Sequence, residues 1–502
     1  MNCFDGTHAL LKKSKSKVIF CCKAVNGTLA ALSEGRMLFS SVPFLYYFLP
    51  AVLLLYAIAP RCLKNTALLL ASLVFYAWGE PRYVVIMLIS ILLGYIFGIL
   101  IERFRGRGGA KLLLFLSVSS SLAFLIYFKY VDFFITNWNA VTGLSVPLLE
   151  IALPIGISFY TFQILSYTVD VYRGDVRAQK NPINLAAYVA LFPQLIAGPI
   201  VRYSDIDRQL TERTHSFDKT AQGIRRFIIG LGKKILIADA FAAFCSDFAA
   251  SDEKSVLFFW LYGVAFSLQI YFDFSGYSDM AIGLGKIFGF DFLENFNYPF
   301  ISGSITEFWR RWHMSLGSWF RDYVYIPLGG NRVSKLRGLF NIFVVWMLTG
   351  FWHGASWNFI FWGLFFALCL LAEKLWLLPH LKKAKVWNHI YVISLVLFSF
   401  VLFASEDMST LLFNLKGLFG IGGVPLVSAP TMYYLRSYAV IFILALVGST
   451  PLPKKLLSGI QQRASGEKIL NLLEPVALVG LLLVMTGYLV DGSFSPFLYF
   501  RF

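Results

Sequence analysis

The sequence predicts an all-α, polytopic membrane protein, and three observations support this prediction. Of the 502 residues, 58% are hydrophobic and only 14% are charged. Apolar runs recur along nearly the whole chain, and a helix needs roughly 20 apolar residues to cross a bilayer. Long strands that alternate apolar and polar residues are missing from the sequence, which argues against an outer-membrane barrel. We therefore expect about eleven to thirteen membrane helices, some of them re-entrant.

The basic residues indicate a membrane topology, although the formal net charge is +16. They cluster in short loops between apolar runs, where positive charge marks the cytoplasmic side. Arg61 and Lys64 follow the first apolar run, and a basic loop at 102–111 follows the third. The turn at 79–82 between them is nearly neutral. We therefore expect these basic loops in the cytoplasm, a lipid bilayer around the helices, and no nucleic-acid partner.

The stretch 1–36 conflicts with this orientation, because it is basic and yet would lie outside the cell. Its apolar run at 18–25 is too short for a signal peptide and contains Lys23. One hypothesis is that the native chain begins at Met37. We therefore treat 1–36 as an N-terminal extension and 37–502 as one membrane domain. The six cysteines show no metal or redox spacing, so we expect no metal site.

Two of the six histidines, His313 and His353, lie inside hydrophobic segments. An ionisable side chain at membrane depth is costly and usually marks a functional site. A neutral imidazole can act as a general base near neutral pH. This combination predicts chemistry inside the bilayer, with these two histidines as the catalytic candidates.

The segment around His313 carries the pattern of a helix start. Ser304 and Glu307 have capping-box spacing, so a helix is expected to begin at Ile305. In one continuous helix, Trp309 and His313 would share a stripe that continues through 316–320. His313 would then be a lone imidazole on an aromatic face. It is either a core histidine bonded to a carbonyl or a functional group.

His353 is expected at the end of a half-helix. The helix leading to it is predicted over 339–352, which at 1.5 Å per residue covers roughly 21 Å of a core about 30 Å thick. Ser356 is a plausible N-cap for a new helix at Trp357. Non-helical backbone at that depth is tolerated only when it is buried in protein or lines a wet cavity. His353, with Trp352 beside it, would therefore lie part-way through the membrane.

The charged residues near these histidines suggest ligand contacts and leave alternatives open. Cations that suit a phosphate-bearing ligand from the cytoplasm are Arg310, Arg321, Arg332 and Lys335. Any one of them can instead be ordinary positive-inside sequence. The carboxylates Asp273 and Asp279 are expected at membrane depth, where they could pair with a cation, orient an imidazole or relay protons. No nucleophile elbow or His-Glu-x-x-His pair supports a hydrolase or a metalloprotease.

Six stretches of the chain, taken together and in order, resemble the membrane-bound O-acyltransferase family. They are 153–163, 192–200, 271–280, 294–297, 308–332 and 352–355. The similarity is to the bacterial branch that holds the membrane subunit of alginate O-acetyltransferase and the related peptidoglycan acetylation protein. It implies many helices around a central tunnel in the bacterial inner membrane, with His353 as the essential histidine and His313 as its partner.

The same resemblance implies the substrates and partners. The acyl donor would be acetyl-CoA, used as a substrate with no permanently bound cofactor. The acceptor would be an extracytoplasmic glycopolymer, either an alginate-like exopolysaccharide or peptidoglycan. A separate secreted or membrane-anchored partner with an SGNH-type, serine-hydrolase-like fold would complete the outer step. By analogy with teichoic-acid D-alanylation, Tyr499 in the aromatic tail would receive the acyl group, unless the tail is a lipid-interface anchor.

Two other functions remain open on the sequence. One is a D-alanyl exporter for teichoic acid, although that branch places the aromatic tail on a separate chain. The other is a secondary transporter of an anionic solute, in which broken helices with buried Asp and His also occur. Inverted repeats would favour the transporter, and we see none in the sequence.

Overall fold

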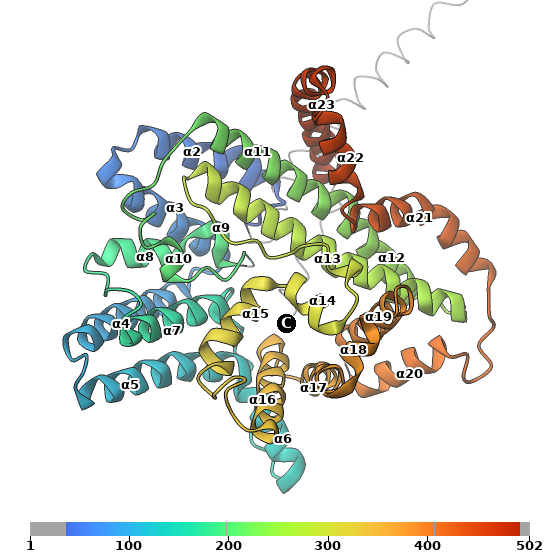
Figure 1. Ribbon diagram of the computed structural model, residues 1–502, viewed down its shortest axis with the longest axis horizontal. Coiled ribbons are helices and arrows are strands. Elements are labelled where there is room, and N and C mark those ends of the chain that lie inside the picture. The colour runs from blue at the N-terminus through green and yellow to red at the C-terminus, as the bar shows by residue number, and fades with distance from the viewer. Residues whose placement is uncertain (1–36, 197, 406, 492–502) are drawn as a thin grey trace, which may run out of the picture.

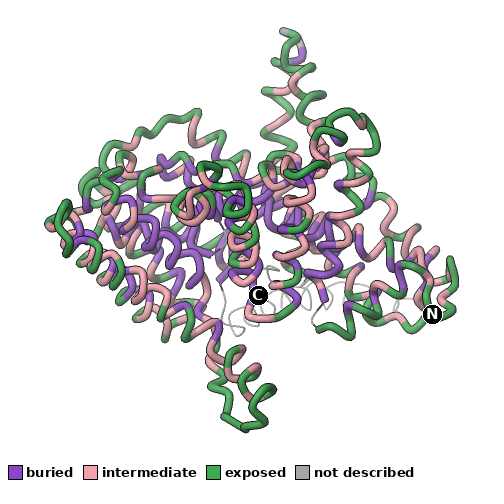
Figure 2. Tube along the Cα trace, turned by 60° about the horizontal axis from the view of Figure 1, so that its bottom comes forward, coloured by how far each residue is buried: buried purple, intermediate pink, exposed green. Residues whose placement is uncertain are grey.

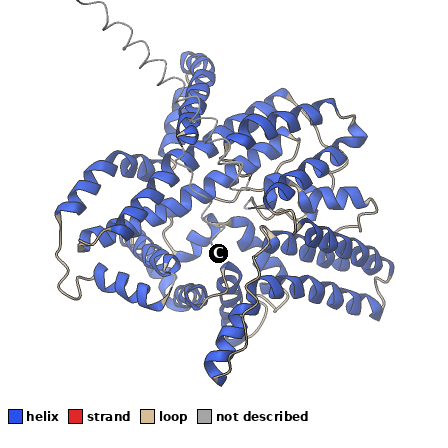
Figure 3. Cartoon of the chain, turned by 180° about the vertical axis from the view of Figure 1, so that it is seen from behind, coloured by secondary structure: helices blue, strands red, loops and turns tan. Residues whose placement is uncertain are grey.

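The computed structural model describes residues 37–196, 198–405 and 407–491. Within these ranges every regular element is a helix (Figure 3). This confirms the predicted all-α class. The candidate extension 1–36 and the tail with Tyr499 lie outside the described residues.

The α-helices, in chain order, are α2 (Leu49–Ile58), α3 (Lys64–Gly79), α4 (Val84–Arg103), α5 (Gly108–Leu125), α6 (Val131–Thr142), α7 (Ile157–Arg173), α8 (Pro182–Ala190), α9 (Phe192–Leu195), α10 (Tyr203–Ile206), α11 (Phe217–Gly232), α12 (Asp239–Ala250), α13 (Val256–Ile287), α14 (Ile305–Arg311), α15 (Met314–Phe320), α16 (Lys335–His353), α17 (Trp357–Ala372), α18 (Leu378–Leu381), α19 (Trp387–Ala404), α20 (Met408–Leu418), α21 (Ala429–Gly448), α22 (Leu452–Gln461) and α23 (Ala464–Val490). Short 3-10 or π-helical segments are η1 (Phe44–Phe48), η2 (Arg61–Leu63), η3 (Ile126–Tyr130), η4 (Lys233–Ala238), η5 (Pro299–Ile301), η6 (Arg321–Tyr325) and η7 (Glu373–Leu377).

Eight helical stretches in the described part of the chain are long and apolar enough to cross a membrane. They are Arg61–Gly79, Val84–Arg103, Gly108–Thr142, Val256–Ile287, Trp357–Leu381, Trp387–Ala404, Ala429–Gly448 and Gly466–Val490. A shorter apolar helix covers Phe44–Ile58. The chain is therefore a multi-pass membrane protein. The larger number of eleven to thirteen membrane helices stays a prediction, because α7 and α16 are not among those eight.

Helix α13, with 32 residues, is the longest α-helix in the described part of the chain, and 67% of its apolar window is buried. It packs against α11, α12, α19, α20 and α21 (Figure 1). Helix α11 approaches α13 closely, because a Cβ on Gly230 would stand only 2.6 Å from the carbonyl oxygen of Gly276. Small residues permit such close backbone contact between membrane helices, where dispersion and not the hydrophobic effect drives association.

The segment α14–α16 lies in the middle of the molecule. In Figure 1 it stands between the group of α4, α5 and α7 on one side and α13, α17 and α19 on the other. Buried residues run through this middle region, whereas the outer helices are largely exposed (Figure 2). In the apolar window of α23 only 6% is buried, so that helix presents most of its surface to lipid. Both candidate histidines belong to the central segment.

Candidate active site

The chain breaks its helix at His313, which corrects the prediction of one continuous stripe. Helix α14 begins at Ile305 as predicted, and the Ser304 hydroxyl accepts a hydrogen bond from the Glu307 amide at 3.0 Å. It ends at Arg311, after which Trp312 is extended. His313 then adopts left-handed backbone angles (φ 44°, ψ 52°) before α15 begins at Met314. Trp309 and His313 therefore lie on different helices.

The break is held by pairing with a loop that is distant in sequence. The Met314 amide donates to the carbonyl of Asn295 at 3.0 Å, and the Asn297 amide donates to the carbonyl of Arg311 at 2.9 Å. These bonds compensate for the helix hydrogen bonds lost at the break. A left-handed conformation costs a non-glycine residue roughly 1–2 kcal/mol, so it persists only where its surroundings enforce it. The strain at His313 is consistent with a functional position.

The side chain of Asn295 fixes the proton position on His313. Its Oδ1 accepts from the Ser315 hydroxyl at 2.9 Å and lies 3.2 Å from Nδ1 of His313. Its Nδ2 donates to the Ser278 hydroxyl at 3.0 Å. Because Oδ1 can only accept, Nδ1 of His313 carries the proton and Nε2 carries the lone pair. Nε2 is buried and has no hydrogen-bond partner within the described residues, so it is available as a base.

His353 is the last residue of α16, and the chain leaves helical geometry at Gly354. The predicted break between His353 and the helix at Trp357 is therefore confirmed, although the Ser356 hydroxyl makes no capping bond. The predicted length was wrong. Helix α16 begins at Lys335 and has 19 residues, or about 28 Å, because the polar residues before Leu339 continue the helix. Helix α16 is thus longer than the predicted half-helix, but His353 does lie at its end as predicted.

Aromatic rings surround His353 and connect it to His313. The His353 ring contacts Trp352 at 5.0 Å, Trp362 at 4.9 Å and Phe403 at 5.6 Å between ring centroids. The Trp352 ring also lies 6.1 Å from the His313 ring. His353 is 6% exposed and His313 is 1% exposed. The structure therefore brings both histidines next to one tryptophan, in a site enclosed by aromatic side chains.

Trp309 supports this enclosure from a distance. Its ring lies 5.6 Å from Trp362, which in turn contacts His353. It also contacts Trp346 at 4.6 Å and Phe366 at 4.9 Å. Trp309 thus packs behind the wall of the site and not against either imidazole.

The two membrane-depth carboxylates are paired with cations. Asp273 lies 2.9 Å from Nζ of Lys234, and both side chains are almost fully buried. Asp279 lies 2.6 Å from Nζ of Lys233 and 2.8 Å from the guanidinium of Arg226. Of the three predicted alternatives, the structure shows the pairing with a cation. These ion pairs join α11 and η4 to α13.

The candidate ligand cations lie at the surface, and one of them forms an ion pair. Arg310, Arg332 and Lys335 are exposed, and none of them forms an ion pair within the described residues. Arg321 is also exposed, but it binds Asp322 at 2.6 Å. Arg202 binds the same carboxylate at 2.8 Å. Burial opposes the charge of Asp322, yet the hydrogen bonds from Arg321 and Arg202 hold its pKa below the ordinary value.

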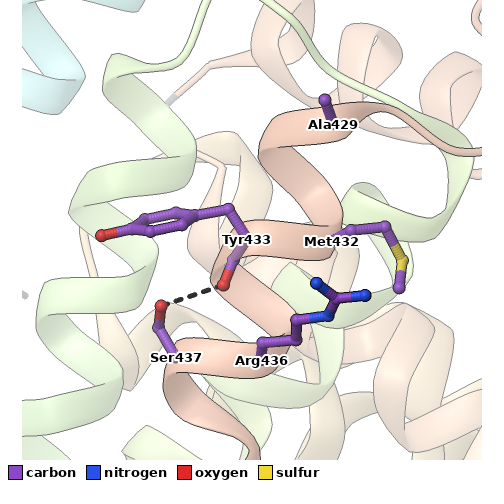
Figure 4. Close-up of a pocket in the computed structure, with 5 residues that line it drawn as sticks. All are labelled: Ala429, Met432, Tyr433, Arg436 and Ser437. Carbon is purple, nitrogen blue, oxygen red and sulfur yellow. Dashed lines mark hydrogen bonds between the residues drawn. The ribbon is translucent and has the colours of Figure 1, made fainter.

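Other features of the structure lie away from the histidines. A depression on α21 is lined by Ala429, Met432, Tyr433, Arg436 and Ser437 (Figure 4). This helix packs against α12, α13 and α22. In the described part of the chain no three His, Cys, Asp or Glu side chains are placed to hold a metal ion.

Sequence reasoning missed four contributors to the site. Asn295 lies in a stretch that was recognised by resemblance, but its bond to His313 depends on the break at 312–313. Trp362 and Phe403 come from helices whose apolar sequence gives no sign of which face meets His353. Lys129, considered below, is a lysine in a long apolar helix. A charged residue in an apolar helix is the sequence signal that could have pointed to Lys129.

The fold is that of a multi-pass helical membrane protein, and two buried histidines lie beside tryptophans at its centre. These features are typical of an enzyme that works within the membrane. Comparison with known proteins identifies its family. The model of the MBOAT, membrane-bound O-acyltransferase family, matches residues 120–412, and the chain belongs to this family. The protein is thus an O-acyltransferase of the bacterial inner membrane.

Several relatives are known by their substrates. A probable alginate O-acetylase, AlgI, of Azotobacter vinelandii is 39% identical over 93% of this chain and 100% of the relative. A peptidoglycan O-acetyltransferase of Helicobacter pylori is 35% identical over 78% of this chain and 81% of its own length. A teichoic acid D-alanyltransferase of Bacillus subtilis is 33% identical, but over only 43% of this chain and 58% of its own.

Proposed function

We propose that this O-acyltransferase takes an acetyl group from acetyl-CoA on the cytoplasmic side and provides it for O-acetylation of an extracytoplasmic polysaccharide. The observation that carries the proposal is His353, which ends α16 inside an aromatic enclosure and shares Trp352 with His313. Relatives named for alginate and peptidoglycan acetylation support acetate as the acyl group and a glycopolymer as the acceptor. The short match to the D-alanyltransferase makes a D-alanyl exporter the weaker alternative.

In the proposed reaction His353 is the general base. An acceptor hydroxyl attacks the thioester carbonyl carbon while its proton moves to the imidazole of His353. A C–O bond forms, and the C–S bond then breaks as the tetrahedral intermediate collapses. The CoA sulfur leaves and takes the proton back from the imidazolium. His353 could instead carry the acetyl group transiently as a nucleophile.

The surroundings of His353 suit this chemistry. His313 presents the lone pair of Nε2, because Asn295 holds the proton on Nδ1. Trp352 and Trp362 exclude water, which protects the thioester from hydrolysis and strengthens polar interactions within the site. The exposed cations Arg310, Arg321, Arg332 and Lys335 are candidates for the phosphates of acetyl-CoA.

We place two further steps after the first transfer. The phenol of Tyr499 would accept the acetyl group on this chain. A secreted or membrane-anchored partner with an SGNH-type fold would then move it to the polysaccharide. The Tyr499 step is supported by the aromatic tail and its analogy with the D-alanylation system. The partner is supported by the resemblance to the bacterial acetylation branch.

The test is acetyl transfer by the purified full-length protein. CoA release from labelled acetyl-CoA is measured for the wild type, for His353→Ala and for His380→Ala. His380 is the control, because its exposed imidazole lies at a helix end and contacts the carbonyl and the ring of Trp376. We expect His353→Ala to lower the rate by at least about 100-fold, the range of general base catalysis, and His380→Ala to leave it unchanged. Normal turnover by a folded His353→Ala variant would overturn the mechanism.

A further inference from the structure

Lys129 is a cation in the middle of an apolar membrane helix. It lies in η3, which joins α5 and α6 into the continuous 35-residue stretch Gly108–Thr142. A lysine in such a helix is costly and needs an internal partner. Within the described residues it forms no ion pair with a carboxylate. Its ammonium instead contacts the end of α16.

The contact is with the main chain of the two residues at the centre of the site. Nζ of Lys129 donates to the carbonyl of Trp352 at 2.6 Å and to the carbonyl of His353 at 3.3 Å. The ammonium also lies 5.9 Å from the centre of the Trp352 ring. The next residue, Tyr130, donates its hydroxyl to the carbonyl of Phe351 at 2.8 Å and stacks on the Phe351 ring at 4.1 Å. Two consecutive residues therefore bind three consecutive carbonyls.

Those carbonyls are the ones that a helix leaves without partners. The last four C=O groups of an α-helix have no intrahelical donor, and they carry the negative end of the helix dipole. In water they would be hydrated, but at membrane depth they need donors from the protein. An ammonium satisfies two of them and places a positive charge at the favourable end of the dipole.

We propose that Lys129 is the positioning residue of the active site, acting through the main chain of α16 to hold the His353 imidazole in its productive orientation. This inference rests on the proposed function of His353. Lys129 binds the carbonyl of His353 itself, so any rotation of the peptide after His353 breaks the bond. The ammonium compensates there for the helix bonds that end at Gly354. Lys129 exchanges no proton with substrate in this role.

The experiment compares Lys129 variants of the full-length protein in acetyl transfer. Lys129→Met keeps the length of the side chain and removes the donor, whereas Lys129→Arg keeps both charge and donors. Lys111→Met is the matched control, because Lys111 is exposed at the start of the same helical stretch. His353→Ala is assayed in parallel. For each protein kcat and KM for acetyl-CoA are measured, together with monodispersity and thermal stability in detergent.

We expect Lys129→Met to lower kcat by about 10- to 100-fold, the cost of misplacing a catalytic group by about 1 Å, while KM changes by less than about threefold. Lys129→Arg should restore most of the loss, and Lys111→Met should match the wild type. The rate of His353 modification by diethyl pyrocarbonate, mapped by mass spectrometry, should change in Lys129→Met. If Lys129 only stabilised the fold, Lys129→Met would lower the thermal stability and would not lower kcat selectively while KM stayed nearly unchanged.

Two results would overturn the inference while leaving the function of His353 intact. One is an inactive His353→Ala beside a Lys129→Met that matches Lys111→Met. The other is a Lys129→Arg no better than a folded Lys129→Met. If Lys129→Met is not monodisperse, Lys129→Gln takes its place, because glutamine keeps a donor and loses the charge. A Lys129→Arg no more active than a folded Lys129→Gln would then overturn the inference. An active His353→Ala would instead refute the proposed function.

Discussion

Gly350 of α16 and Gly363 of α17 lie backbone against backbone. A Cβ on Gly350 would stand 3.1 Å from the Cα of Gly363 and 2.3 Å from the carbonyl oxygen of Phe359. Real side chains do not come so close to a main chain, so the two helices can pack this tightly only with glycine at both positions. This contact lies one helical turn before His353 and fixes how α16 meets α17.

Gly350→Ala should therefore reduce both stability and activity. The added methyl group must push α17 away from α16, at a cost of about 1–3 kcal/mol, the usual cost of overpacking. The shift would also move Trp362 from His353. Thermal unfolding in detergent and acetyl transfer measure the two effects. Gly480→Ala on α23 is the control, because a Cβ there meets nothing within 4 Å. Equal behaviour of the two variants would contradict the packing argument.

Asn295→Leu should lower activity more than stability. It removes the acceptor that holds the proton on Nδ1 of His313, and the ring would then sample the wrong tautomer. In a triad of similar logic the wrong tautomer costs several orders of magnitude, so we expect at least about a 100-fold fall in kcat. Ser278→Ala removes only the acceptor of Asn295 Nδ2 and should have a much smaller effect. A Ser278→Ala variant as impaired as Asn295→Leu would show that packing, and not the tautomer, matters here.

Asp273→Asn should destabilise the fold and not block chemistry directly. Removing one partner of a buried ion pair typically costs about 3–5 kcal/mol, and we expect the lower end of this range because Lys234 keeps its bond to Asp239. Asp273 and Lys234 are such a pair, with 3% and 5% of their side chains exposed. The double variant Asp273→Leu, Lys234→Met should recover only part of the lost stability. Lys234 also binds Asp239, and the double variant leaves that carboxylate without its lysine. Activity per folded molecule is the decisive measurement. A stable Asp273→Asn without activity would indicate a direct role for the carboxylate.

The parts of the structure that depend on local sequence could be predicted. The apolar runs predict the membrane helices, because each must satisfy its backbone internally. Ser304 predicts the start of α14, and the predicted break before Trp357 is found after His353. His313 and His353 are visible as ionisable groups in apolar surroundings. None of these inferences requires knowledge of which helices touch.

The parts that depend on distant contacts could not be predicted. Local periodicity continues a helix through His313, and only pairing with the loop at Asn295 interrupts it. The membrane-depth carboxylates find their cations on α11 and η4, tens of residues away. Lys129 reaches carbonyls more than 200 residues later in the chain. Such pairings follow from the packing of the helices, which a single sequence does not specify.

Tyr499→Phe should abolish acetylation of the tail while leaving the protein folded. A phenol with a pKa near 10 is a better leaving group than a sugar hydroxyl, so an acetyl phenol ester retains enough reactivity for onward transfer. After incubation with acetyl-CoA, peptide mass spectrometry should find an acetyl adduct on Tyr499 in the wild type. The adduct should be missing from His353→Ala and from Tyr499→Phe.

Tyr47→Phe is the control for this experiment, because the Tyr47 side chain is 66% exposed and its loss should leave the adduct unchanged. Polysaccharide acetylation in cells gives the second measurement. If Tyr499 carries the acetyl group outward, Tyr499→Phe loses this product even though the histidines are intact. Full polysaccharide acetylation by Tyr499→Phe would instead mean that the acceptor reaches His353 directly, and that the aromatic tail anchors the chain at the lipid interface.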